Sequence, residues 1–176
     1  PSANACAHCG QLLLHTGLEG PDGMAFCCEG CREVHGLLAG ERWRPYRDLM
    51  ELDGRKAPRA FLGEADRARI AAFRDPAAVA NLGRWRDRLH GVPLRSRDFT
   101  CAGCGYLIET LAGEMPGVRS CRTDFLHGTA WLEYDADATA LADVLEGFAR
   151  YGYRLEPDED PAAPAPKAER ETMYRI

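Results

Sequence analysis

Two cysteines lie three positions apart in FTCAGCGYLIE, residues 99–109. The segment stands between a strand-like run at 92–98 and an apolar run at 107–112 that favours a helix. Cys104 would fall in the first helical turn, where unpaired N–H groups and the helix dipole favour a thiolate. Two soft thiolates select Cu(I), or less specifically Zn(II), over hard cations. The spacing alone leaves a redox pair and half of a zinc site open as alternatives.

The residues around this pair predict an α+β domain. The expected elements are a strand at 92–98, a helix at 106–112, strands at Val118–Phe125 and Thr129–Tyr134, a helix at about 138–151 and a strand at 152–156. A turn at His127-Gly128 joins the middle strands, and Asp135-Ala136-Asp137 is expected to cap the second helix. The resulting order, βαββαβ, is the ferredoxin-like arrangement. Cys121 falls on the inward face of its strand, so we expect it in the core.

A second group of cysteines lies within the first 31 residues, in CAHCG from Cys6 and FCCEGC from Phe26. One pair sits at a turn and the other enters a helix, which is typical of a small treble-clef-like zinc module. A bound metal would supply folding energy that so short a segment lacks. Five thiols compete for four positions, and spacing alone does not choose among them; they are Cys6, Cys9, Cys27, Cys28 and Cys31. Because thiols suffice, we expect packing or surface roles for the histidines His8, His15 and His35.

Composition narrows the class of protein. The chain has 176 residues, 45% of them hydrophobic, and its eight cysteines occur in close clusters, which indicates reduced thiols that bind metal. Residues 99–176 carry 14 acidic against 7 basic side chains, a net charge of −7. Nucleic-acid binding requires a basic face, so we expect no nucleic-acid partner. No run of about 18 apolar residues could span a bilayer, so no membrane span is expected in this fragment.

The middle of the chain is expected to be helical. Residues 41–52 carry apolar side chains at helical spacing, and Asp75-Pro76 is expected to start a helix that runs to about Leu89. We expect this connector to pack the two cysteine modules into one unit, with Trp43 and Trp85 buried between helices. No phosphate-binding loop, Ser/His/Asp arrangement or pair of carboxylates indicates an enzyme.

Several motifs together resemble the heavy-metal-associated domain of copper chaperones and heavy-metal P-type ATPases. They are Thr100-Cys101 with Cys104, Ile108-Glu109, Pro116-Gly117-Val118, Gly128 with Tyr134-Asp135, and Gly152-Tyr153. Two departures are Phe99, where the family usually has Met, and Gly105, where a branched residue is common. The N-terminal cysteines resemble the zinc fingers of a large-subunit ribosomal protein and of bacterial metal sensors. That resemblance implies Cys6, Cys9, Cys27 and Cys31 as zinc ligands and Cys28 as the spare.

The two modules together are similar to copper-transporting P-type ATPases that supply haem–copper oxidases. The resemblance implies four parts: a Cys-rich metal module at 1–40, a helical connector at 41–91, a heavy-metal-associated domain at 92–156, and a flexible linker at 157–176 toward a missing membrane helix. Cys101 and Cys104 would then bind Cu(I) on an exposed loop, while Zn(II) occupies the N-terminal module. Whether the copper is cargo or a regulatory signal, and whether Ag(I) replaces it, stays open.

The same resemblance implies the setting. The expected partners are a copper chaperone or other donor and the membrane and ATP-hydrolysing domains of the parent protein. The fragment would be a soluble, non-enzymatic part on the cytoplasmic side of the bacterial inner membrane, and the parent an ATP-driven copper translocase. The alternatives are a thiol-disulfide oxidoreductase acting through Cys101 and Cys104, and a structural zinc module that serves as an interaction platform.

Overall fold

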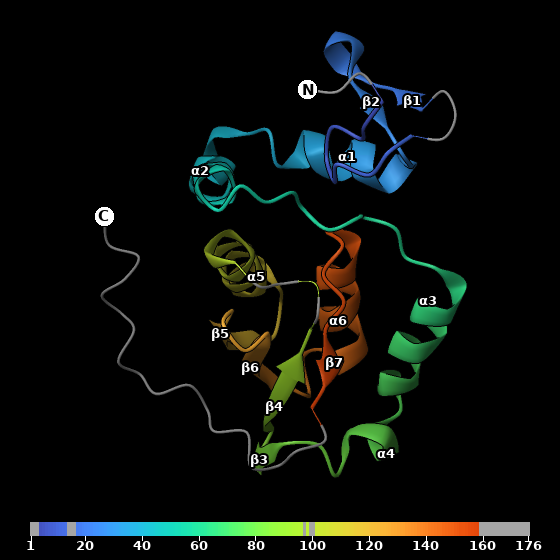
Figure 1. Cartoon of the computed structure of the whole chain (residues 1–176). Coiled ribbons are helices and arrows are strands. Elements are labelled where there is room, and N and C mark those ends of the chain that lie inside the picture. The colour runs from blue at the N-terminus through green and yellow to red at the C-terminus, as the bar shows by residue number, and fades with distance from the viewer. Residues whose placement is uncertain (1–3, 14–16, 97, 99–100, 159–176) are drawn as a thin grey trace.

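The computed structural model describes residues 4–13, 17–96, 98 and 101–158 (Figure 1). His15, Phe99, Thr100 and most of the expected linker, residues 159–176, lie outside these residues. Among the residues that the structure describes, no helix has the length and apolar character needed to cross a membrane.

The N-terminal module is a short β-hairpin followed by one helix. Strand β1 (Leu18–Glu19) pairs antiparallel with β2 (Ala25–Phe26) around a 3₁₀ turn at Pro21–Gly23, and α1 spans Glu29–Leu37. Phe26 and Val34 are buried in this module. The expected helix after the second cysteine group is therefore present.

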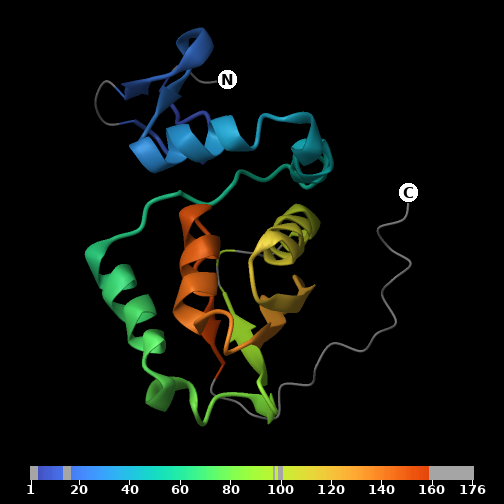
Figure 2. The ribbon, with the colours of Figure 1, turned by 180° about the vertical axis from the view of Figure 1, so that it is seen from behind.

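The connector contains three helices. A 3₁₀ turn at Glu41–Trp43 leads into α2 (Arg44–Leu52), and α3 (Glu64–Ala71) is followed by a 3₁₀ turn at Ala72–Arg74 and by α4 (Pro76–Val79). The Asp75 carboxylate accepts a hydrogen bond of 2.9 Å from the Ala77 N–H, so the predicted N-cap before a proline is confirmed. Between α2 and α3 the chain passes between α1 and the helices of the sheet domain (Figures 1 and 2).

The helix predicted from Pro76 to Leu89 is wrong beyond Val79. Gly83 (φ +62°) and Asp87 (φ +53°) adopt left-handed backbone, and the chain turns back as β3 (Arg84–Arg86) paired with β4 (Leu89–Arg95). Gly83 lies so close to the next strand that an added Cβ would meet the Gly91 carbonyl oxygen at 2.0 Å. The predicted burial of Trp85 is wrong as well, because the residue is 43% exposed on this hairpin. Its ring stacks on that of His90, with the ring centroids 3.9 Å apart.

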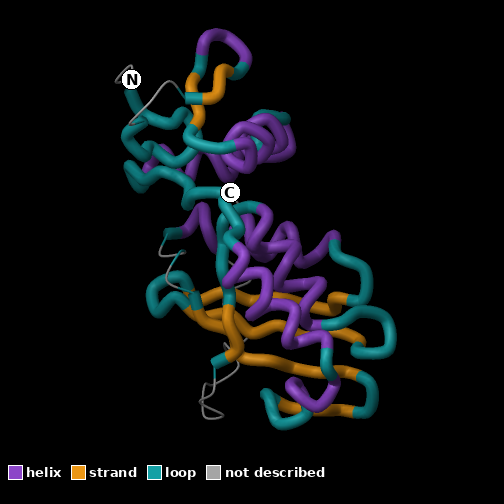
Figure 3. Tube along the Cα trace, turned by 90° about the vertical axis from the view of Figure 1, so that its right-hand side faces the viewer, coloured by secondary structure: helices purple, strands orange, loops and turns teal. Residues whose placement is uncertain are grey.

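The C-terminal part has the predicted α+β, ferredoxin-like order. After β4 come α5 (Ala102–Glu114), β5 (Val118–Asp124), β6 (Thr129–Asp135), α6 (Leu141–Arg150) and β7 (Glu156–Pro157). All strand pairs are antiparallel, and the strand order is β3-β4-β6-β5. Strand β7 pairs with the end of β4, at Leu94 and Arg95, and β3 pairs with its beginning. Helices α5 and α6 cover one face of the sheet (Figure 3). The turn at Gly128 (φ +65°) is confirmed.

The predicted cap of the second helix is wrong. Helix α6 starts at Leu141 behind Ala140, which supplies no capping side chain, while Asp135 instead accepts a hydrogen bond from the Asp137 N–H in the preceding turn.

One cluster of buried side chains runs through the described residues, from the N-terminal module through α2 into the sheet domain. Trp43 is buried in it, as predicted. Helix α2 packs against α5, and Gly30 of α1 lies against the Ala60 carbonyl of the connector. The N-terminal module is thus attached to the sheet domain by packing as well as by the chain.

Candidate metal centres

Four cysteine sulfurs meet in the N-terminal module. Those of Cys6, Cys9, Cys27 and Cys31 all lie within 4.8 Å of one another. The sulfur of Cys27 is 3.7 Å from that of Cys9 and 3.6 Å from that of Cys31. A tetrahedron with sulfur about 2.3 Å from its centre has edges of about 3.8 Å. The donor set and its spacing therefore fit one tetrahedral cation such as zinc.

Local structure holds these thiols together. Gly10 (φ +73°) closes the turn between the first pair with a hydrogen bond of 2.9 Å from its N–H to the Cys6 carbonyl. Cys27 directly follows β2, and Cys31 is buried in the first turns of α1. A turn and a helix start converge here, as the paired spacing predicts.

Burial and backbone hydrogen bonds determine how readily the thiols of this cluster ionise. It raises the pKa of Cys27 to about 12 and also raises the pKa of Cys31, because a buried thiolate loses its hydration. Burial opposes ionisation of Cys6 too, but backbone N–H groups around it lower its pKa to about 7. Several thiolates can coexist here only beside a cation, which is the chemistry of a closed structural metal site.

Cys28 lies outside the group of four, although its sulfur is 3.8 Å from that of Cys27. It is the N-cap of α1, and its sulfur accepts a hydrogen bond of 3.5 Å from the Cys31 N–H. The structure thus gives Cys28 a local role in the helix.

The histidines of the described module supply no ligand to the four-sulfur group. His8 is buried, its Nε2 has no hydrogen-bond partner within the described part of the chain, and burial together with the neighbouring His35 lowers its pKa to about 4. The two rings meet edge to face at 6.2 Å.

The second candidate site lies at the N-terminus of α5. Cys101 is the N-cap, and its sulfur accepts a hydrogen bond of 3.2 Å from the Cys104 N–H, which places the pair at the positive end of a 13-residue helix. In this structure the two cysteines form a disulfide with Cα atoms 5.3 Å apart. A metal could use both sulfurs only after reduction to the dithiol.

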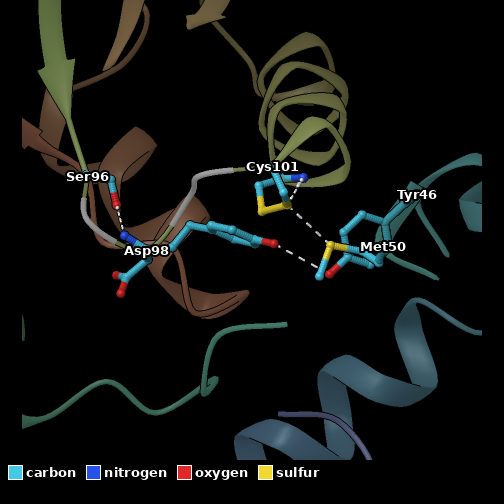
Figure 4. The surroundings of a disulfide bond; sticks show 7 residues. Tyr46, Met50, Ser96, Asp98 and Cys101 are labelled. Atoms are coloured by element: carbon cyan, nitrogen blue, oxygen red, sulfur yellow. Dashed lines mark hydrogen bonds between the residues drawn. A yellow bond between two sulfur atoms is a disulfide. The ribbon is translucent and has the colours of Figure 1, made fainter. Parts of the chain in front are cut away.

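Asp98, before this pair, is held by a partly buried contact with Arg154. The Asp98 carboxylate accepts hydrogen bonds from the Arg154 backbone N–H (3.1 Å) and from its guanidinium (3.3 Å). The Asp98 N–H in turn donates to the Ser96 hydroxyl at 3.0 Å (Figure 4). These bonds tie the end of β4 to the chain after α6.

The expectation of an exposed Cys-x-x-Cys loop is wrong. Cys101 and Cys104 are 2% and 4% exposed, because α2 lies across the start of α5. The Met50 sulfur is 3.5 Å from the Cys101 sulfur (Figure 4). Sequence reasoning placed Met50 on the apolar face of a helix and assigned it no part in the site. The only sequence signal for Met50 was its helical spacing with Trp43 and Tyr46. That spacing predicts a buried helix face but does not predict which residues the face covers.

Cys121 is buried on β5, as expected for a core residue, and burial raises the pKa of its thiol. The nearby Glu109 carboxylate accepts hydrogen bonds from the Thr123 N–H (2.7 Å) and hydroxyl (2.8 Å), which binds α5 to this strand. Glu109 of the motif therefore serves the fold.

Comparison with family models decides the nature of this part of the chain. Residues 94–154 match the model of the heavy-metal-associated domain. This segment is a heavy-metal-associated domain. Two of its motif glycines adopt left-handed backbone that favours glycine, Gly117 with φ +79° and Gly152 with φ +91°. A Cβ added at Gly152 would also lie 2.9 and 3.0 Å from the Pro58 and Arg59 carbonyl oxygens.

Two similar solved structures each cover about two fifths of this chain. Oxidized MerP from Ralstonia metallidurans CH34 is 20% identical with a TM-score of 0.39, and the match covers 40% of this chain and 99% of MerP. The Cu(I)-loaded N-terminal domain of a potential copper-translocating P-type ATPase from Bacillus subtilis is 25% identical with a TM-score of 0.37, and the match covers 38% and 84%. No curated protein matches the chain.

Proposed function

We propose that this chain is the Cu(I)-binding N-terminal region of a copper-exporting P-type ATPase, and that Cys101 and Cys104 hold the metal as two thiolates. The observation that carries the proposal is a cysteine pair at the N-terminus of α5 within a heavy-metal-associated domain. The helix N-terminus favours thiolates, and two soft sulfurs favour Cu(I). The bound Cu(I) is either transported or regulates transport. It arrives from a donor protein and leaves to an acceptor by exchange of thiolate ligands.

Zinc is the cation that we propose for Cys6, Cys9, Cys27 and Cys31. Four thiolates in a closed tetrahedral arrangement are typical of structural zinc. The N-terminal module would then hold its hairpin and α1 in place, while the heavy-metal-associated domain exchanges Cu(I). The parent protein would lie in the bacterial inner membrane with this region on the cytoplasmic side, and would hydrolyse ATP through domains that this chain does not contain.

Copper binding to the reduced, zinc-loaded chain tests the proposal. We expect one Cu(I) per chain in competition with a Cu(I) chelator, and its loss when Cys101 and Cys104 are both replaced by Ser. Cys121→Ser is the matched control, because it removes a buried thiol of the same domain that lies on β5 and not at the start of α5. Equal Cu(I) affinity in the double variant and the wild type would refute the assignment.

The disulfide favours a second candidate, a thiol-disulfide oxidoreductase. Such an enzyme needs one sulfur that a substrate thiolate can reach and attack. At 2% and 4% exposure, neither Cys101 nor Cys104 offers this access while α2 is in place. Catalysed reduction of a model disulfide by the dithiol form, at a rate above that of free dithiol, would support this candidate against copper exchange.

A further inference from the structure

The cover over the copper site is itself a sulfur donor. Helix α2 directs Tyr46 and Met50 inward, and both are buried, as is Trp43 at the end of the preceding 3₁₀ turn. Met50 is 7% exposed, and its thioether points at the cysteine pair (Figure 4). Its sulfur lies 3.5 Å from that of Cys101. Two sulfurs that share one ion at about 2.3 Å each are separated by at most about 4.6 Å. The observed separation falls within that reach.

Close packing fixes the thioether in this place. A Cβ added at Gly103 would lie 3.0 Å from both Cγ and Sδ of Met50 and 3.3 Å from Cβ of Leu49. A glycine between the two cysteines therefore lets α2 approach the first turn of α5. Any larger side chain there would press on the thioether.

Other contacts hold α2 against the sheet domain. The hydroxyl groups of Tyr46 and Tyr153 lie 3.4 Å apart beneath the helix. The Arg42 guanidinium donates to both carboxylate oxygens of Glu114, at 2.6 and 2.7 Å, at the far end of α5. These contacts hold α2, and with it Met50, against the sheet domain.

We propose that Met50 is a third ligand for Cu(I), supplied by α2 to the Cys101 and Cys104 thiolates. The inference rests on the proposed copper site and adds the ligand that completes it. A thioether is a soft neutral donor that suits Cu(I) and offers little to harder divalent cations. It raises the coordination of Cu(I) to three sulfurs without adding a third negative charge to a buried site. It also leaves with α2, so an incoming thiolate takes its place when α2 withdraws.

The alternative is that Met50 only fills space, since methionine packs readily against irregular surfaces. Packing and ligation differ in one observable, a direct bond between copper and the side-chain heteroatom of Met50. Selenomethionine labelling makes this bond visible, because selenium scatters more strongly than sulfur in copper K-edge X-ray absorption.

The test uses the full, reduced, zinc-loaded chain labelled with selenomethionine and loaded with one equivalent of Cu(I). We expect a Cu–Se contribution in the labelled wild type, its loss in Met50→Leu, and its retention in Met115→Leu. Met115 is at the opposite end of α5, so the control changes a methionine of the same domain away from the cysteines. Leucine is close to methionine in volume and keeps the packing nearly intact.

The outcomes separate this inference from the proposed function. A labelled wild type that binds Cu(I) through Cys101 and Cys104 but shows only Cu–S scattering overturns the Met50 ligand and leaves the copper site standing. Retention of the Cu–Se signal in Met50→Leu also overturns it. Cu(I) that stays bound after both cysteines become Ser overturns the proposed function instead. The wild-type spectrum needs no substitution, so the result does not depend on the folding of a variant.

Discussion

Replacing Met50 by Ala should open the cysteine pair to solvent. In the reduced protein, alkylation of Cys101 and Cys104 requires α2 to move, because the two residues are 2% and 4% exposed beneath it. Removing a buried methionine side chain costs about 2–5 kcal/mol. If that loss falls on the docking of α2, the open fraction rises at least about 30-fold, since each 1.4 kcal/mol is a factor of ten.

The assay is the rate at which iodoacetamide modifies Cys101 and Cys104, followed by mass spectrometry in reduced, zinc-loaded, copper-free protein. Mass spectrometry separates these thiols from those of the N-terminal cluster. Met115→Ala is the control, since it truncates a partly buried methionine at the other end of α5. The reasoning is refuted if Met50→Ala leaves the rate unchanged, if both variants raise it equally, or if the wild-type thiols already react as fast as thiols in the unfolded chain.

Three further predictions concern the parts that hold this arrangement. Removing zinc with a strong chelator should abolish amide protection in β2 and α1 while β4–β6 keep theirs; protection that survives verified metal loss would contradict a structural metal. Gly30→Ala should lower the melting temperature, because its Cβ would lie 1.7 Å from a backbone carbonyl, whereas Gly36→Ala on the same helix meets nothing within 4 Å and should be neutral or stabilising. Burial lowers the pKa of His90, so its neutral form contributes stability that is complete above pH about 6.5 and is lost as pH falls toward the lowered pKa. The free energy of unfolding in urea should therefore decrease less from pH 7 to 5 in His90→Gln than in the wild type. An equal decrease in both proteins would contradict this.

Much of the sheet domain was predictable because its signals are local. Alternating side chains mark β5 and β6, and a glycine with positive φ marks the turn between them. The error after Val79 shows the limit of such signals. Leu82, Trp85 and Leu89 have the spacing of a helix face, yet backbone at Gly83 must bend to meet Gly91, a contact that periodicity does not encode.

The two candidate sites differ in the same way. In the N-terminal module all four clustered thiols lie within 26 positions of one another. Their paired spacing at a turn and a helix start predicted a metal module, and the resemblance to zinc fingers selected these four of the five thiols. The cover of Cys101 comes from a residue 51 positions earlier in the chain. No local pattern states which surface the apolar face of α2 will meet, so the sequence read alone left the cysteine pair exposed.

The attachment of α2 links the two candidate metal sites. The Arg47 guanidinium donates to the Leu38 carbonyl at 2.7 Å and to the Gly40 carbonyl at 2.8 Å, so the end of α1 and the body of α2 are held together. A cavity of about 630 Å³ borders both His8 of the N-terminal module and Met50. The ion pair between Arg42 and Glu114 is exposed and contributes little, about 1 kcal/mol or less. Buried packing around Trp43 and Met50 therefore supplies most of the docking energy of α2. Under the proposed function, a donor or acceptor reaches the copper only when that packing is released, so the N-terminal module, through its hold on α2, helps to set how readily Cu(I) is exchanged.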